Sequence, residues 1–407
     1  MSKVFFFNIP FHGHMNPSLG LVKELVNRGE EVIYYCTDSF KEKIESAGAT
    51  FRSYGKKFYL NENFVTYNIT ELYRIHMDLS ELILDDLLND IKTEKPDYII
   101  HDSLCTWAKH AAEVSNVPAV NTITTLVMVP DGIMLTVNFL ISLSLAVLTN
   151  IPNMKKIYKI SRSLKRKYNI NANSLIDIVV NKEKMNLVYT SKEYQPQSEK
   201  LENGYRFVGP LSVYRNEDSS KLVLNRSGNK PLLFISMGTI FNNNKEFFYK
   251  CVEAFGDMDL DILMSVGKNV DISSLTIPDN FTVKHYYEIP QLDVLKKCSV
   301  FITHGGMNST HEGLFNGIPL VVIPQQEEQA YVAKQVVRSG CGICLNRSNA
   351  TSKMLRDSVE KIISDKSFKE NALKMRDSFI SAGGAKRAVE EIFSYTRKKC
   401  VTNQTTH

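Results

Sequence analysis

The chain has 407 residues, of which 43% are hydrophobic and 23% are charged, and its formal net charge is +5. This composition is typical of a globular protein long enough for two domains, and it excludes a disordered chain. The excess of positive charge is too small and too evenly spread to indicate nucleic acid binding, although it suits a small anionic ligand.

The N-terminal half alternates between short apolar runs and amphipathic segments. Three apolar runs predict buried strands, at residues 4–9, 31–36 and 97–101. Asn16 is expected to cap a helix that has Pro17 at its first position. A further helix is expected at residues 106–115. This alternation predicts β–α–β units and therefore a mostly parallel sheet.

The N-terminus and the cysteines indicate the cellular compartment of the protein. The run "MSKVFFFNIPFHGH" has one lysine, a short apolar stretch and no small-residue cleavage pattern, so it fits a first strand rather than a signal peptide. Seven scattered cysteines lack the spacing of a disulfide framework, and the lone C-x-x-C pair, Cys341 and Cys344, is not enough for a metal or redox site. We therefore expect a cytoplasmic protein.

One segment leaves two interpretations open. Residues 132–148 are strongly apolar, and residues 155–168 follow with seven positive charges. The apolar run is marginal for a membrane span because it contains Asn138 and several hydroxyls. We favour an apolar wall of a binding cleft, and contact with a membrane surface is the alternative.

A polar stretch divides the chain. Residues 213–229 have the composition of a linker, which separates an N-terminal domain (1–212) from a second α/β series (230–387). Ligands of open α/β sheets bind at the carboxyl ends of the strands. Three polar loops follow predicted strands in this way: "PFHGHMNP", "HDS" and "THGGMNST".

The run "THGGMNSTHEGLFNGIPLVVIPQQEEQ" (303–329) is a candidate anion site. The apolar strand 299–303 is followed by Gly305 and Gly306, and a helix opens directly after them. A helix N-terminus presents amide groups and favours negative charge, and glycines let a ligand approach the backbone. The segment therefore predicts a site for an anionic group.

His14 and Asp102 form a candidate acid–base pair. His14 lies just before the helix expected at Asn16, where the helix dipole disfavours imidazolium, so a neutral ring could accept a proton. Asp102 could hold the tautomer and stabilise the acquired charge. The alternative, equally supported by spacing, is a loop histidine and a helix-capping aspartate. Of the other histidines, His12 is expected to line a cleft and His311 to lie on a helix surface.

Three motifs together carry a resemblance over nearly the whole chain. "GHMNPSLGL", "PQLDVL" and "THGGMNSTHEGLFNGIPLVVIP" resemble the UDP-sugar-dependent glycosyltransferases that include plant flavonoid and bacterial macrolide enzymes. The resemblance implies the GT-B fold, with two facing Rossmann-like domains, parallel sheets and an interdomain cleft. The acceptor would bind the first domain and the UDP-sugar the second, and a C-terminal helix (388–407) would return to the first domain.

The resemblance also implies roles for individual residues. His14 would be the general base that deprotonates the acceptor hydroxyl, with Asp102 as its partner. The diphosphate would be held by His304, Gly306, Asn308 and Ser309. Glu312 would hold the ribose and Gln291 the base. The full set of implied donor-binding residues is Thr239, Ser265, Ile289, Gln291, His304, Gly306, Asn308, Ser309, Glu312, Glu328 and Gln329. Trp107 and Met128 are expected to line the acceptor pocket, although core residues would look the same in the sequence.

Two positions depart from the family pattern. Glu288 stands where an aromatic residue usually stacks on uracil, and Tyr286 or Tyr287 are the candidate substitutes. Glu328, beside Gln329, replaces the aspartate of a D-Q pair that grips sugar hydroxyls. UDP-glucose remains the default donor.

The expected activity is an inverting sugar transfer to a hydroxyl of an apolar small molecule such as a flavonoid, polyketide or macrolide. No metal cofactor is expected, because the D-x-D spacing in "DMDLD" (257–261) fits a solvated turn and fails the EF-hand pattern. Two alternatives remain. The acceptor could be a membrane lipid or sterol, or the chain could bind nucleotide sugars without turnover.

Overall fold

The computed structural model describes residues 1–61, 64, 69–127, 150–170, 181–214, 230–238 and 244–404, with side chains as far as residue 396. The chain divides into two compact units, one comprising Met1–Tyr214 and Ala382–His407 and the other Arg215–Ser381. Within the described ranges, no helix combines the length and apolarity needed to cross a bilayer. The apolar run 132–148 lies outside the described residues.

The first unit is built on a seven-stranded sheet in the order β3-β2-β1-β4-β5-β6-β7, with every neighbouring pair parallel. Its strands are β1 (Lys3–Phe7), β2 (Glu31–Cys36), β3 (Thr50–Ser53), β4 (Tyr98–Asp102), β5 (Ala119–Ile123), β6 (Asn186–Val188) and β7 (Tyr205–Phe207). Alternate side chains of β1 enter two different cores, Phe5 on one face and Phe6 on the other. A strand buried on both faces needs the uninterrupted apolar run that the sequence has there.

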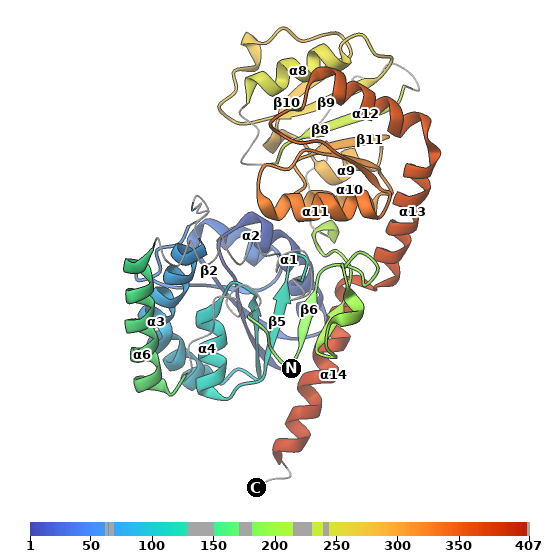
Figure 1. Cartoon of the computed structure of the whole chain (residues 1–407). Coiled ribbons are helices and arrows are strands. Elements are labelled where there is room, and N and C mark those ends of the chain that lie inside the picture. The colour runs from blue at the N-terminus through green and yellow to red at the C-terminus, as the bar shows by residue number, and fades with distance from the viewer. Residues whose placement is uncertain are drawn as a thin grey trace. The chain divides into compact units, whose positions relative to one another are not determined.

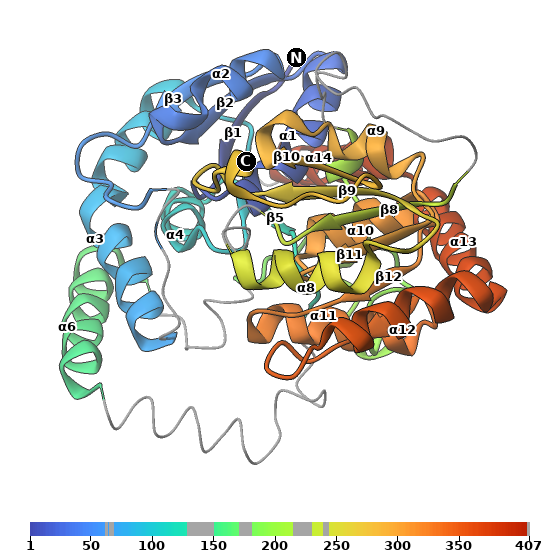
Figure 2. The same ribbon diagram turned by 90° about the horizontal axis from the view of Figure 1, so that it is seen from above.

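Helices cover both faces of this sheet (Figures 1 and 2). They are α1 (His12–Asn27), α2 (Lys41–Ser46), α3 (Ile69–Glu94), α4 (Thr106–Ser115), α6 (Ile151–Tyr168) and α14 (Gly384–Gln404). On one face α3 packs between α4 and α6. On the other, Val389 and Ile392 of α14 share a core with Leu21 and Leu25 of α1. The C-terminal helix is thus part of the first unit, and it begins at Gly384, earlier than the predicted residue 388.

The first helix begins earlier than the sequence predicts. Its N-cap is Phe11, and the amides of His14 and Met15 already donate to the Phe11 carbonyl at 2.9 Å. Asn16 is therefore inside the helix and does not cap it. Pro17 is the sixth residue of the helix, where a proline cannot donate the backbone hydrogen bond to the carbonyl four residues earlier. His14 consequently lies in the first turn of α1.

The second unit has a parallel six-stranded sheet in the order β10-β9-β8-β11-β12-β13. Its strands are β8 (Leu232–Ser236), β9 (Asp261–Val266), β10 (Phe281–His285), β11 (Val300–Thr303), β12 (Leu320–Val322) and β13 (Gly342–Cys344). Its helices are α8 (Lys245–Phe255), α9 (Gln291–Leu295), α10 (Met307–Phe315), α11 (Glu327–Arg338), α12 (Ser352–Ser364) and α13 (Lys366–Ser381). Short 3₁₀ turns occur in the two units at Asp38–Phe40, Ser198–Lys200, Ser212–Tyr214, Ile272–Ser274 and Tyr286–Glu288.

Both sheets are Rossmann-like, and each has a point where the strand order reverses. The reversal lies between β1 and β4 in the first unit and between β8 and β11 in the second. Ligands of such sheets bind beyond the carboxyl ends of the strands at this point. The topology therefore directs attention to the residues that follow Phe7, Asp102, Ser236 and Thr303.

Candidate active site

His14 and Asp102 meet at the switch point of the first sheet. The Nδ1 atom of His14, in the first turn of α1, lies 2.8 Å from Oδ2 of Asp102, the last residue of β4. The Asp102 side chain is 1% exposed, whereas that of His14 is 15% exposed. Asp102 is therefore buried, and the His14 imidazole is the member of the pair that reaches solvent.

Asp102 fills both of the roles that the sequence left open, as the partner of His14 and as a capping aspartate. Its Oδ1 accepts the backbone N–H of Leu104 at 2.9 Å, as a turn-capping aspartate would, while Oδ2 contacts the imidazole. A carboxylate beside Nδ1 favours the tautomer with the proton on Nδ1. The lone pair is then on Nε2, the atom that would accept a proton. The first turn of α1 adds a dipole that disfavours a permanently charged ring.

Two further residues position His14, and sequence reasoning missed both. Asn8, directly after β1, donates from Nδ2 to the His14 carbonyl at 3.2 Å and to the Tyr34 hydroxyl at 2.7 Å. Thr124, directly after β5, places Oγ1 3.2 Å from His14 Nδ1. Their signal in the sequence is a polar residue at or directly after the carboxyl end of a strand, as for Asp102. Two strand ends thus contact the His14 imidazole, and a third holds the His14 backbone.

In the second unit, His304 follows β11 and lies in a space that two glycines leave open. A Cβ on Gly238 would come within 2.6 Å of the His304 ring, and one on Gly306 within 2.5 Å. Gly238 also has a φ of +77°, a conformation that suits glycine. Burial lowers the pKa of His304 to about 4. The ring is therefore neutral near pH 7 and can donate a hydrogen bond without carrying charge.

The glycine turn leads into α10 as the sequence predicts. Gly305 has a φ of +84° and Gly306 is the N-cap. Asn308 and Ser309 lie half-buried in the first turn, where backbone amides have no intrahelical acceptors. This end of α10 has the composition and the dipole of an anion site. Thr239, predicted beside it, lies outside the described residues.

Two of the predicted donor residues contact each other directly. Gln291, the first residue of α9, donates from Nε2 to Oε2 of Glu312 in α10 at 2.7 Å. Glu312 is only 1% exposed, and Ile289, just before α9, is also buried. A buried carboxylate aligned by an amide is suited to accept hydrogen bonds from a diol.

Known proteins resemble this chain along almost its full length. The family model described as "Erythromycin biosynthesis protein CIII-like, C-terminal domain" matches residues 249–393. YojK of Bacillus subtilis, named as an uncharacterized UDP-glucosyltransferase, is 32% identical over 98% of both chains. The NDP-glycosyltransferase YjiC of the same organism is 34% identical over 97% of both chains. This chain belongs to the UDP-glycosyltransferase family.

Solved structures agree with this assignment. The glycosyltransferase of kitacinnamycin superposes with a TM-score of 0.83 at 26% identity, and the calicheamicin glycosyltransferase CalG4 with 0.80 at 25% identity. Each comparison covers 97% of this chain and 98% of the other. The predicted GT-B class, with its two Rossmann-like domains, is confirmed, and the chain is an enzyme that transfers sugars.

In this glycosyltransferase Glu288, which departs from the family pattern, has a structural role. Its carboxylate accepts the backbone N–H of His285 at 2.9 Å and caps the Tyr286–Glu288 turn. Tyr287 is 60% exposed and stacks on the His285 ring, with ring centroids 5.3 Å apart and planes 7° apart. One face of the Tyr287 ring is thus covered by His285, and the side chain is largely exposed to solvent.

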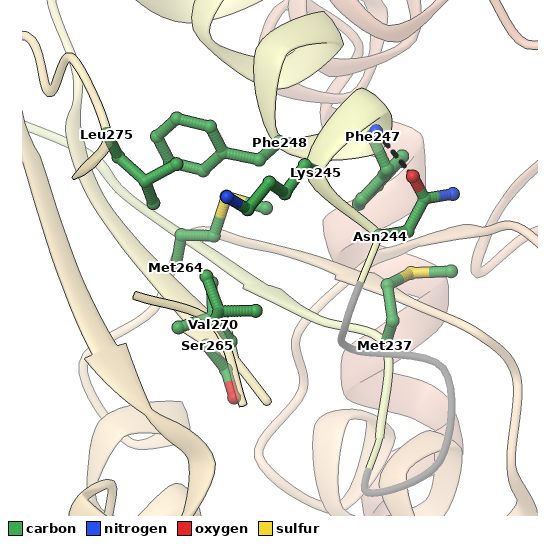
Figure 3. A pocket seen from close by; sticks show the side chains of 10 residues that line it. Met237, Asn244, Lys245, Phe247, Phe248, Met264, Ser265, Val270 and Leu275 are labelled. Carbon is green, nitrogen blue, oxygen red and sulfur yellow. Dashed lines mark hydrogen bonds between the residues drawn. The ribbon is translucent and has the colours of Figure 1, made fainter. Parts of the chain in front are cut away.

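The other predicted donor residues of the glycosyltransferase that the structure describes lie in β9 and α11. Ser265, near the end of β9, lines a small cavity with the side chains of Met237, Met264 and Phe248 (Figure 3). The cavity holds about 10 Å³, room for about one water molecule. In the first turn of α11, Glu328 is exposed while Gln329 is buried. The Gln329 side chain turns back to accept the Gln325 N–H at 2.8 Å.

Two expectations about aromatic residues of the glycosyltransferase need correction. Trp107 does not line an open pocket: it is completely buried, in edge-to-face contact with Tyr54 and Phe58. His311 does not lie on a helix surface, because α13 covers that side of α10 and the ring packs against Phe379 at 5.1 Å. Met128 lies outside the described residues. His12 packs against Phe40, with centroids 5.0 Å apart.

The acidic turn 257–261 has cationic partners within the protein. Asp257 pairs with Arg356 at 2.6 Å and Asp259 with Lys230 at 2.8 Å. Across the described ranges, no group of three or more His, Cys, Asp or Glu residues is arranged to hold a metal ion.

Proposed function

We propose that this enzyme transfers a hexose, by default glucose, from a UDP-sugar to a hydroxyl of an apolar small molecule, with inversion at the anomeric carbon. The observation that carries the proposal is the 2.8 Å contact between His14 Nδ1 and Asp102 Oδ2. The names of YojK and YjiC support a nucleotide-sugar donor. The similarity to the kitacinnamycin and calicheamicin glycosyltransferases supports a natural-product acceptor.

The proposed step is a single displacement. Nε2 of His14 takes the proton of the acceptor hydroxyl as its oxygen attacks the anomeric carbon. The bond from that carbon to the UDP oxygen breaks, and UDP leaves with the bonding electrons. Asp102 stabilises the imidazolium that forms. One displacement on one face of the sugar inverts the anomeric configuration.

The second unit is proposed to hold the donor. The first turn of α10 and the neutral His304 suit the diphosphate, whose negative charge increases as the bond breaks. The Glu312 carboxylate, aligned by Gln291, would accept hydrogen bonds from the ribose hydroxyls. Tyr287 would stack on the base, in the place of the aromatic residue that Glu288 replaces.

Because helix amides and a neutral imidazole are proposed to stabilise the leaving diphosphate, the reaction is expected to need no metal ion. Turnover should be unchanged when EDTA is added. Activity that is abolished by EDTA and restored by magnesium would contradict this part of the proposal.

A donor-by-acceptor mass-spectrometry screen on the purified protein tests the function as a whole. We expect a product heavier by one hexose with UDP-glucose and at least one phenol or macrolide. A hexose on sterol or lipid in vesicles, with none on soluble acceptors, would move the acceptor class to the membrane. If the protein binds the UDP-sugar but releases no UDP, it is a non-catalytic binding protein. The intact His14–Asp102 pair argues against this hypothesis.

A further inference from the structure

The outer side of α6 carries a basic surface. Its sequence, Ile151–Tyr168, contains no acidic residue and seven Lys or Arg residues. The inner side is apolar: Ile157, Ile160 and Leu164 are buried in the core shared with α3 and α4. A helix of this composition is strongly amphipathic, so its charged side must meet either water or a partner.

Only part of the charge on α6 is neutralised within the protein. Lys156 pairs with Asp78 of α3 at 2.7 Å, and Lys167 pairs with Asp85, which is also in α3. Four other cations have no carboxylate within ion-pair distance in the described part of the chain, and we call them the basic face: Lys155, Lys159, Arg162 and Arg166.

The basic face is a narrow stripe with apolar neighbours. At about 100° per residue, its four members fall within roughly 60° of the helix circumference. Ile151 and Tyr158 lie along one edge of the stripe and are 52% and 68% exposed. Together with Met154 and Ser163, these residues border an open depression on the surface.

We propose that this side of α6 docks the enzyme on an anionic lipid bilayer. Cations attract acidic headgroups, and exposed apolar and aromatic side chains enter the headgroup region. A nucleic acid would match the charge but would offer no place for Ile151. The docking does not depend on which sugar or acceptor the enzyme uses.

Vesicle flotation tests the docking without any substrate. The purified full chain is floated with phosphatidylcholine vesicles that either contain or lack phosphatidylglycerol, at low and high salt. We expect binding only to the vesicles with phosphatidylglycerol, weakening as salt rises. Absence of binding at low salt would overturn the proposal.

A charge-matched pair of variants separates the basic face from net charge. The test variant carries Lys155→Gln, Lys159→Gln, Arg162→Gln and Arg166→Gln. The control variant carries Lys361→Gln, Lys366→Gln, Lys374→Gln and Lys386→Gln, all on exposed positions of other helices. Each membrane-facing cation contributes about fivefold in binding, so the test variant should lose at least ~100-fold. The control should stay within about twofold of the wild type. Equal losses in both variants would overturn the proposal.

The apolar edge gives a second test that charge alone would not satisfy. Tyr158→Ser should weaken vesicle binding several-fold, whereas Tyr249→Ser, on α8 and 49% exposed, should not. An RNA oligonucleotide bound as tightly as the vesicles, with no effect of Tyr158→Ser, would assign the basic face to nucleic acid and refute the membrane proposal. All variants should release UDP from soluble substrates at the wild-type rate. Loss of flotation with retained turnover therefore reports on docking alone.

Discussion

Replacing Asp102 with asparagine should separate its catalytic contribution from its structural one. The amide oxygen of the new side chain could still accept the Leu104 N–H, which lies 2.9 Å from Oδ1 of Asp102, so the turn after β4 should persist. The charge beside His14 Nδ1 would be lost, and an amide nitrogen facing the ring would favour the tautomer with its proton on Nε2. That tautomer cannot act as the base.

The size of the effect follows from the geometry. A carboxylate and an imidazolium whose charges are about 4 Å apart attract each other by about 4 kcal/mol at an effective dielectric constant of ~20. Losing that stabilisation in the transition state slows the reaction by about 10³-fold. The donor KM should be unchanged, because the residues proposed to bind the donor are on the other unit.

Steady-state UDP release checks this prediction. Asp97→Asn is a matched control, because Asp97 is exposed and lies just before β4, at the opposite end of the strand from Asp102. The double variant Asp102→Asn/His14→Ala should be no slower than His14→Ala alone, since the two residues act as one unit. An Asp102→Asn enzyme that keeps more than about a tenth of the wild-type rate, or losses that add in the double variant, would refute the reasoning.

Three further outcomes are expected. Gly238→Ala should weaken UDP binding, measured by calorimetry, by at least ~10-fold, because its Cβ would lie 2.6 Å from His304 at a φ of +77°; Gly29→Ala, with similar φ and open space, should not. Glu312→Gln should raise the donor KM about 10- to 100-fold while keeping the contact to Gln291, and an unchanged KM would exclude the ribose role. Between pH 7 and pH 5 the free energy of unfolding should fall by roughly 2 kcal/mol for each buried histidine whose pKa is lowered, because the unfolded chain then binds protons that the folded one does not. A urea midpoint that does not fall would contradict this. Burial lowers the pKa to about 4 for His76, His110 and His304 and to about 3 for His311.

Local patterns in the sequence predicted the strands and the glycine turn well. The run at 31–36 coincides with β2, and the strand before Gly305 coincides with β11 to within one residue. A few adjacent residues are enough to indicate these features. An apolar run indicates a buried strand, and a glycine indicates a turn that needs a positive φ. The start of α1 was mispredicted because Asn16 and Pro17 form a strong local capping signal, whereas the chain enters the helix at Phe11.

The contacts that position His14 depend on the sheet and were partly missed. Asp102 was predicted as a partner because a carboxylate after a strand suggested it, but Asn8 and Thr124 lie after strands that local patterns do not place side by side. The burial of Trp107 and His311 likewise comes from elements distant in sequence, the Tyr54–Phe58 segment and α13. Residue type alone does not distinguish such core positions from a pocket lining.

The central claim is that the imidazole of His14 deprotonates the acceptor, and the rate of UDP release by His14→Ala with a soluble phenol tests it most directly. The account predicts a rate lower by about 10²- to 10⁴-fold, with UDP affinity equal to that of the wild type by calorimetry. A His14→Ala enzyme that releases UDP at the wild-type rate would contradict the account.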